Sequence, residues 1–183
     1  MLELKFDKFP VLETERLRLR QLTMDDVPVL FEMRTNVMMN RYTDRAKMKT
    51  VEEAVEKMKT ILDMVENRTG IAWAIEMKES ETQIGEISFW RIIKEHYRAE
   101  IGYSLLPDYW EKGYMTEAAR CAIDYGFSML NFHSIEANVN PGNIASIKLL
   151  EKMHFVREAY FKENYFYDGK FLDSAIYSLL NNS

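Results

Sequence analysis

The sequence predicts a mixed α/β domain, with a mostly antiparallel sheet of about seven strands and helices on both faces. Three patterns support this prediction. Some short segments alternate apolar and polar residues, as half-buried strands do, while longer segments repeat apolar residues every three or four positions, as amphipathic helices do. Near the centre the two kinds of segment alternate. Because no linker or internal repeat divides the chain, we expect residues 1–183 to form one domain.

The first third of the chain predicts one strand followed by two helices. Leucines alternate with arginines over residues 16–22, which is typical of a half-exposed strand. A short helix is expected over residues 23–34. Thr50 and Glu53 have the spacing of a capping box, and apolar residues then recur with helical period through residues 51–65.

The rest of the chain predicts an antiparallel meander and then alternating helices and strands. In chain order we expect strands at 70–77, 83–90 and 99–106, a helix at 115–130, a strand at 134–140 and a helix at 143–153. Small residues along the helix at 115–130 would let it lie close against a sheet. Two long strands flank Asp168-Gly169, which is a strong signal for a β-hairpin.

Composition argues against several classes of function. A net charge of −5 disfavours non-specific nucleic-acid binding, which needs a basic surface. The single cysteine, Cys121, cannot form a disulfide or a cysteine metal site within the chain, and the three histidines lack metal-ligand spacing. There is no signal-peptide pattern and no apolar run of about 18 residues. We therefore expect a cytoplasmic protein that needs no metal, nucleic acid or membrane.

The segment YWEKGYMTEAAR, residues 109–120, is a candidate anion site. A strand that ends at a turn where a helix begins directs free backbone N–H groups and the positive end of a helix dipole at one point. Few basic side chains lie in the segment, so main-chain amides would have to bind most of a phosphate. Taken alone, the segment is explained more simply as a plain turn with Gly113 at positive φ.

Two longer segments, AEIGYSLLPDYWEKGYMTEA (99–118) and ANVNPGNIASIKLLEKMHF (137–155), resemble the GNAT N-acetyltransferase superfamily. The opening segment LETERLRLRQLTMDD (12–26) resembles its RimJ/RimL-like branch, the ribosomal-protein N-terminal acetyltransferases. The likeness covers about residues 13–180. It implies a GNAT fold whose sheet is splayed in the middle, acetyl-CoA as the donor and a primary amine as the acceptor.

The resemblance favours a protein N-terminus, of ribosomal-protein type, as the acceptor. A small-molecule amine, such as a polyamine or an aminoglycoside-like drug, is the second interpretation within the enzyme class. A third interpretation is a sensor that binds acyl-CoA without turnover. The sequence leaves the oligomeric state open between a monomer and a homodimer.

The resemblance also implies where the coenzyme binds. The family's pyrophosphate loop, Q/R-x-x-G-x-G/A, corresponds to residues 110–115, and Gly113 matches its central glycine. The splayed strand corresponds to residues 100–106 and its partner to residues 134–140. The expected coenzyme-binding residues are Tyr103, Ser104, Leu105, Trp110, Glu111, Lys112, Gly113, Tyr114, Met115, Thr116, Asn138, Asn143 and Ser146. Of these, Trp110, Glu111 and Met115 depart from the family's pattern.

Catalysis requires a base for the amine and an acid for the leaving thiolate. Glu100 is the first candidate for the base and Glu86 the second, because a glutamate within an apolar strand is unusual; a solvated sheet edge is the alternative for each. Many superfamily members use a tyrosine as the acid, but Leu150 occupies its position here. RimL-type enzymes carry a serine where Ser146 stands, which makes Ser146 the acid candidate. Asn143 either contacts the coenzyme or caps a helix.

Overall fold

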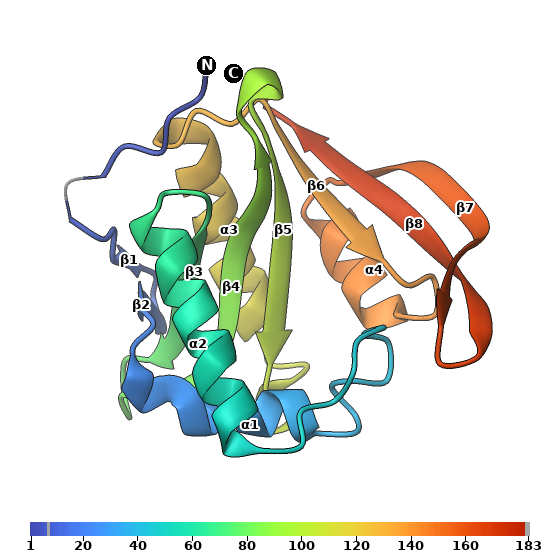
Figure 1. Ribbon diagram of the computed structural model, residues 1–183. Coiled ribbons are helices and arrows are strands. Elements are labelled where there is room, and N and C mark those ends of the chain that lie inside the picture. Colours follow the sequence, from blue (N-terminus) through green and yellow to red (C-terminus); the bar gives the residue numbers. More distant parts are fainter. Residues whose placement is uncertain (7, 182–183) are drawn as a thin grey trace.

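A sheet of eight strands, in the order β1-β2-β3-β4-β5-β6-β8-β7, runs through the computed structural model, which describes residues 1–6 and 8–181 (Figure 1). The strands are β1 (Leu12–Glu13), β2 (Leu17–Gln21), β3 (Ile71–Met77), β4 (Thr82–Ile93), β5 (Arg98–Leu105), β6 (Ser134–Val139), β7 (Val156–Tyr167) and β8 (Lys170–Leu180). The helices are α1 (Val27–Thr35), α2 (Val51–Glu66), α3 (Tyr114–Ser128) and α4 (Ile144–Lys152). Three short 3-10 turns, η1 (Met24–Asp26), η2 (Lys94–His96) and η3 (Pro107–Tyr109), precede α1, β5 and α3.

The predicted fold class is confirmed, with two differences in the strands. Leu12 and Glu13 pair with β2 and add an edge strand that two residues are too few to reveal in a sequence pattern. β4 continues to Ile93, where the sequence predicted a loop, and its pairing with β5 is irregular between Trp90 and Ile93. That irregularity breaks the alternation on which the prediction depended.

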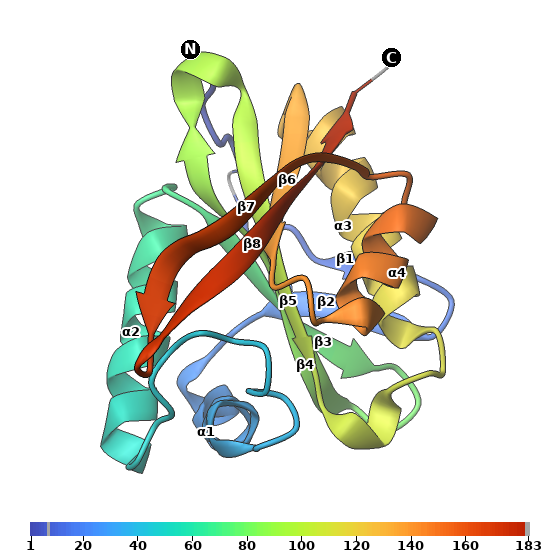
Figure 2. The same ribbon diagram turned by 90° about the vertical axis from the view of Figure 1, so that its right-hand side faces the viewer.

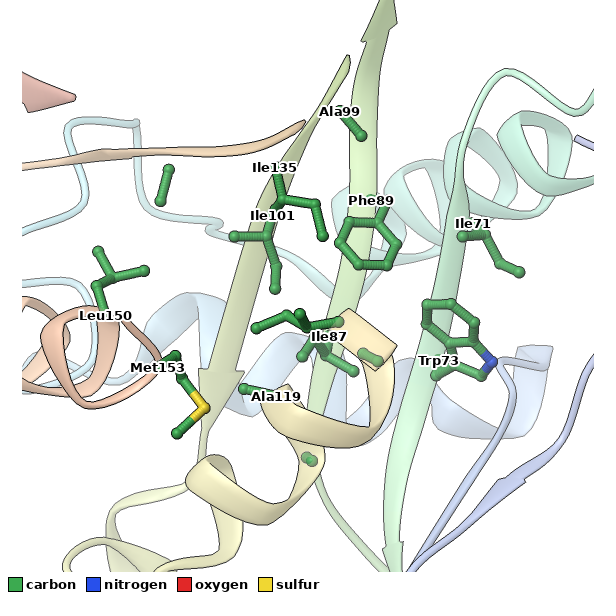
Figure 3. Packing of buried hydrophobic residues seen from close by; sticks show 14 of the residues in the cluster. Ile71, Trp73, Ile87, Phe89, Ala99, Ile101, Ala119, Ile135, Leu150 and Met153 are labelled. Atoms are coloured by element: carbon green, nitrogen blue, oxygen red, sulfur yellow. The ribbon is translucent and has the colours of Figure 1, made fainter. Parts of the chain in front are cut away.

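Helices cover both faces of the sheet (Figures 1 and 2). On one face, apolar residues of α2 such as Ala54 and Met58 pack with Ala72 and Ala74 of β3. On the other face, the alanines of α3 pack against the larger core formed by β3, β4 and β5, part of which Figure 3 shows. A Cβ on Gly126 of α3 would lie 3.1 Å from the rings of Phe89 and Phe132, so the small residues do allow close packing.

The β7–β8 hairpin projects from the edge of the sheet beyond β6 (Figure 2). Asp168 and Gly169 form its two-residue turn with φ values of 48° and 77°, and Tyr167 pairs with Lys170. Two positive φ values define the type I′ turn that matches strand twist, so the predicted hairpin is confirmed. No helix in the described part of the chain is long and apolar enough to cross a membrane.

The sheet is splayed between β5 and β6, its one parallel pair among the described strands. The two strands pair only at Arg98–Ser134, Ala99–Ile135 and Glu100–Glu136. Beyond Glu100 and Glu136 they diverge toward η3, as Figure 1 shows. The divergence leaves one edge of β5 without a neighbouring strand from residue 101 to residue 105.

Candidate active site

The turn before α3 presents free main-chain donors. Gly113 is the N-cap of α3 with φ 81°, and the first bond of the helix joins the Glu117 N–H to the Gly113 carbonyl at 3.1 Å. The N–H groups of Tyr114, Met115 and Thr116 therefore have no acceptor within the helix. Together with the helix dipole, they form an arrangement suited to an anion. Glu111 is exposed and also has positive φ, 60°, a conformation that glycine adopts more easily.

The side chains of this turn hold it to the end of β5. The Trp110 indole N–H donates to the Leu105 carbonyl at 2.6 Å, although the ring is 39% exposed. Lys112 Nζ donates to the Asp108 carbonyl at 2.8 Å and lies 5.8 Å from the centre of the Tyr109 ring. The tryptophan that departs from the family pattern thus has a structural function here: it fixes the loop against the strand.

Arg16, between β1 and β2, clamps the same turn from the other side. Its guanidinium pairs with Glu117 at 2.7 Å, donates to the Lys112 carbonyl at 3.1 Å and stacks 4.3 Å from the centre of the Tyr114 ring. Burial raises the pKa of Glu117, but hydrogen bonds from Thr14 and Arg16 and the charge of Arg16 outweigh it, so the pKa is lowered overall. The alternation of leucines and arginines over residues 16–22 indicates only a strand, so the contact of Arg16 with this turn was not predicted.

The unpaired edge of β5 offers main-chain groups at alternate residues. The Leu106 N–H donates to the Ile84 carbonyl, which together with the antiparallel register turns the main-chain groups of Gly102 and Ser104 toward β4. Those of Ile101, Tyr103 and Leu105 therefore point away from β4, toward the divergence. Tyr103 and Leu105 lie as a pantetheine-binding edge requires, whereas Ser104 could contribute only its side chain, on the α1 face.

Tyr103 and Ser146 meet on the opposite face of the sheet. The Tyr103 hydroxyl lies 2.8 Å from Ser146 Oγ, and burial raises the pKa of Tyr103 to about 12. The family resemblance implied Tyr103 as a coenzyme-binding residue, but no sequence pattern indicated its phenol as a partner of Ser146. Leu150, at the position of the family's tyrosine, is buried in the core. A phenol from β5 therefore supplies a hydroxyl on the face where α4 has none at residue 150.

The two asparagines expected to bind the coenzyme, Asn138 and Asn143, have different surroundings. The Asn143 side chain accepts from the Ser146 N–H at 3.1 Å and caps α4, so capping, one of the two expected roles, is present. This cap fixes the turn that carries the Ser146 hydroxyl. Asn138 is exposed and alternates with the buried Ala137 and Val139, which places its side chain on the α1 face.

Both candidate bases also lie on the α1 face. Glu86 pairs across the strands with Ser104, and Glu100 with Trp90. Glu100 is 8% exposed and accepts from Arg91 at 3.2 Å. Burial raises the pKa of Glu100 and the charge of Glu136 adds to the rise, while Arg91 opposes it. Glu100 is also the last residue of β5 to pair with β6, at the point where the strands diverge.

Glu86 is held in a buried ion pair. Arg34, near the end of α1, reaches Glu86 Oε1 at 2.5 Å, and both side chains are largely shielded from solvent. No local pattern indicates this partner, which lies 52 residues away. Because removing one member of such a pair leaves the other charged and buried, the pair fixes α1 to β4.

The splayed sheet and the donor turn suit the binding of an acyl-coenzyme A, and comparison with known proteins gives the family. The family model described as "Acetyltransferase (GNAT) domain" matches residues 16–156, and the chain belongs to this family. It is a GNAT-family N-acetyltransferase. Acetyl-CoA donates the acetyl group in this family. The backbone N–H groups of the α3 turn suit its pyrophosphate, and those of the β5 edge suit its pantetheine arm.

The names of the similar proteins give different acceptors or none. The chain is 36% identical to the uncharacterized N-acetyltransferase YoaA of Bacillus subtilis, over 94% of this chain and 97% of that protein. It is 27% identical to the spermidine N(1)-acetyltransferase of Escherichia coli K12, over 84% and 80%. The ribosomal-protein-S5-alanine acetyltransferase of Vibrio fischeri shares the fold, with a TM-score of 0.81, 24% identity and coverage of 95% and 98%.

Replacing Gly113 with alanine should weaken coenzyme A binding about 5- to 10-fold. An alanine at φ 81° costs roughly 1–2 kcal/mol, and relaxation of the turn would turn its N–H groups away from the anion. Calorimetric titration with coenzyme A measures the effect. Gly169→Ala is the matched control, because Gly169 has φ 77° with nothing within 4 Å of a Cβ, far from α3. Equal coenzyme affinities in the two variants would exclude this function for Gly113.

Proposed function

We propose that this enzyme transfers the acetyl group of acetyl-CoA to the N-terminal amine of a protein by direct attack across the splayed sheet. One observation carries the proposal: Glu100 and the Tyr103–Ser146 pair lie on opposite faces of β5, beside the divergence of β5 and β6. An amine can then approach from the α1 face while the thiol leaves toward the α4 face. No covalent acyl-enzyme is required, and Cys121 takes no part.

The coenzyme is held by main-chain groups in this proposal. The N–H groups of Tyr114, Met115 and Thr116 bind the pyrophosphate, with Gly113 giving the turn its shape. The main-chain groups of Tyr103 and the N–H of Leu105 pair with the pantetheine arm, as an added strand would, while the Leu105 carbonyl accepts from Trp110. An N–H of this edge next to the thioester also stabilises the oxyanion that forms on attack. Arg16 acts indirectly, by positioning the turn.

Glu100 is the proposed base. The attacking amine must lose a proton, directly or through a water molecule, and a carboxylate with a raised pKa is better matched to that task near neutral pH. Glu86 remains the second candidate, but it is held at 2.5 Å by the buried Arg34, whereas the arginine that pairs with Glu100, Arg91, is 3.2 Å away and mostly exposed. This looser pairing supports Glu100 over Glu86.

Ser146 and Tyr103 are the proposed acid. As the carbon–sulfur bond breaks, the Ser146 hydroxyl gives its proton to the sulfur while the Tyr103 hydroxyl passes its own proton to Ser146 through their 2.8 Å hydrogen bond. Solvent then returns a proton to Tyr103, and Glu100 releases the proton of the amine to solvent. The raised pKa keeps the Tyr103 phenol protonated across the working range. The Asn143 cap holds the serine in place. The proton taken from the amine on one face is thereby balanced by a proton delivered to the thiol on the other.

Two kinds of acceptor have support among the relatives. The fold shared with a ribosomal-protein acetyltransferase supports a protein N-terminus, and the 27% identity to a spermidine acetyltransferase supports a polyamine as the second candidate. Both acceptors present a primary amine. We favour the protein N-terminus because a groove of about 610 Å³, between residues 37–47 and the tip of the β7–β8 hairpin, offers room for the residues that follow the amine.

A thiol-release assay tests the proposed function. Acetyl-CoA is offered with peptides that have free N-termini, with the same peptides N-acetylated, and with spermidine. We expect thiol release with free N-terminal peptides and none with the blocked ones. Release with spermidine alone would assign the second acceptor. Coenzyme binding without release on any amine would contradict catalysis by the Glu100 and Ser146 arrangement.

A further inference from the structure

A basic groove lies between the loop joining α1 to α2 (residues 36–50) and the tip of the β7–β8 hairpin. Its volume is about 610 Å³. Its charged lining consists of the basic residues Arg41, Arg45, Lys47 and Lys170 and the acidic residues Asp44 and Asp168. Asp44 already accepts a hydrogen bond from the Tyr165 hydroxyl. The groove is therefore locally cationic, although the whole chain has a net charge of −5.

The wall of the groove that comes from the α1–α2 loop is fixed by internal hydrogen bonds. The buried Asn40 amide donates to the Met33 carbonyl at 2.8 Å and to the Asn36 carbonyl at 2.7 Å. Thr43 Oγ1 donates to Asn40 Oδ1 at 3.1 Å. These bonds hold the loop to the end of α1, so a ligand of the groove need not order it first.

The groove opens beside the face from which the amine approaches. Arg45 lines the groove and lies close enough to Glu86 and Arg34 to interact with both charges. The Tyr42 ring packs against Gly142, where a Cβ would be 3.1 Å from the ring, in the turn that leads into α4. A chain lying in the groove would therefore extend away from an amine held on the α1 face of β4 and β5.

We propose that this groove binds acidic side chains in the first few residues after the N-terminal amine of the acceptor protein. The inference rests on the proposed function and adds a sequence preference to it. Carboxylates complement the excess of basic groups, whereas the several ammonium groups of a polyamine would be repelled by them. Nucleic acids are also anionic, but they offer no N-terminal amine to the acceptor face.

Binding of labelled peptides tests this preference directly. Three octapeptides share a free N-terminus and a C-terminal fluorophore and differ at the third to sixth residues, which are acidic, amide isosteres or lysines. With coenzyme A saturating, we expect the acidic peptide to bind about 10-fold tighter than its amide isostere, and the lysine peptide weakest, by fluorescence anisotropy. The advantage should shrink when salt rises from about 0.05 M to about 0.5 M.

Charge-neutralising variants show whether the groove is responsible. The double variant Arg41→Gln/Lys47→Gln should bring the acidic and amide peptides within about 2-fold of each other. The control Lys59→Gln/Lys148→Gln removes the same charge from exposed positions on α2 and α4 and should keep the preference. A preference that survives the groove variant, or vanishes in the control as well, would overturn the assignment.

Other outcomes separate this inference from the proposed function. Tighter binding of the lysine peptide or of spermidine than of the acidic peptide would overturn the inference while leaving acetyl transfer intact. Tighter binding of a single-stranded RNA oligonucleotide would assign the groove to nucleic acid and overturn it too. If the acidic peptide binds with the stated preference and no acceptor releases thiol, the proposed function fails, and only the preference of the groove for acidic side chains stands.

Discussion

Replacing Ser146 with alanine should lower kcat by about 100-fold, and Tyr103→Phe should lower it by a comparable factor. General acids contribute roughly 10²- to 10⁴-fold, and a serine alone is a weak acid that needs its phenol partner. Because the two hydroxyls share one hydrogen bond, they act as a unit. The double variant should therefore be only slightly slower than either single variant, and steady-state kinetics of thiol release measure this double-mutant cycle.

Controls separate this effect from loss of packing. Ser128→Ala removes a hydroxyl that bonds the Asp124 carbonyl of its own helix, and it should leave kcat unchanged. Both active-site variants should keep their affinity for coenzyme A within about 3-fold, since only a hydroxyl is lost from each. Additive effects of the two substitutions would contradict a shared proton path, and an unchanged kcat in Ser146→Ala would remove Ser146 from the chemistry.

Local patterns were enough to predict most of the fold. The Thr50 cap, which accepts from the Glu53 N–H, the Asp168-Gly169 turn and the small residues of α3 each act through nearby backbone, so their consequences can be inferred from sequence. The second half of the expected capping box differs, because Glu53 accepts from the Lys49 N–H. The end of β4 was missed because an irregular pairing interrupts its alternation. The two-residue β1 exists only through its pairing with β2.

The candidate site was less predictable because its key contacts join distant segments. Arg16 and Glu117 are 101 residues apart, and Tyr103 and Ser146 are 43 apart. A periodicity shows on which face a side chain lies, but not what lies opposite it. Trp110 looked like a departure from the family pattern until its bond to the Leu105 carbonyl gave it a function.

Net charge does not describe every part of the surface. The chain carries −5, yet the groove between the α1–α2 loop and the β7–β8 hairpin has more basic than acidic side chains. Charged groups act over about a Debye length, which is roughly 8–10 Å in physiological salt. A ligand in the groove therefore responds to the residues around it, and the sum over the whole surface matters mainly for solubility.

Replacing Glu100 with glutamine should lower kcat/KM by about 100-fold near neutral pH and abolish the fall in activity on the acidic side of the pH profile that its ionisation causes. Glutamine keeps the shape of the side chain but cannot take a proton from the amine. Rates measured from about pH 6 to about pH 9 check this result. A Glu100→Gln profile that matches the wild type would place the base elsewhere, with Glu86 the next residue to substitute.

The same substitution should not destabilise the protein, which distinguishes a catalytic role from a structural one. Burial raises the pKa of Glu100 above 4.5, so its neutral form favours folding; that contribution is complete below 4.5 and is lost as pH rises through the raised pKa. Glutamine does not ionise, so the Glu100→Gln variant should not lose this stability as the pH rises. Near neutral pH it should unfold at the same denaturant concentration as the wild type, or at a higher one.

Glu136→Gln provides the matched test of the same argument. Glu136 lies in register with Glu100 on β6, and its negative charge raises the pKa of Glu100. Removing that charge should lower the pKa, shifting the acidic limb of kcat/KM to lower pH while leaving the plateau rate nearly unchanged. If Glu100 is the base, the two substitutions therefore have different effects: Glu100→Gln removes the acidic limb of kcat/KM, and Glu136→Gln moves it to lower pH. An effect of Glu136→Gln on the plateau without a shift of the limb would indicate that the pair only supports the sheet where β5 and β6 diverge.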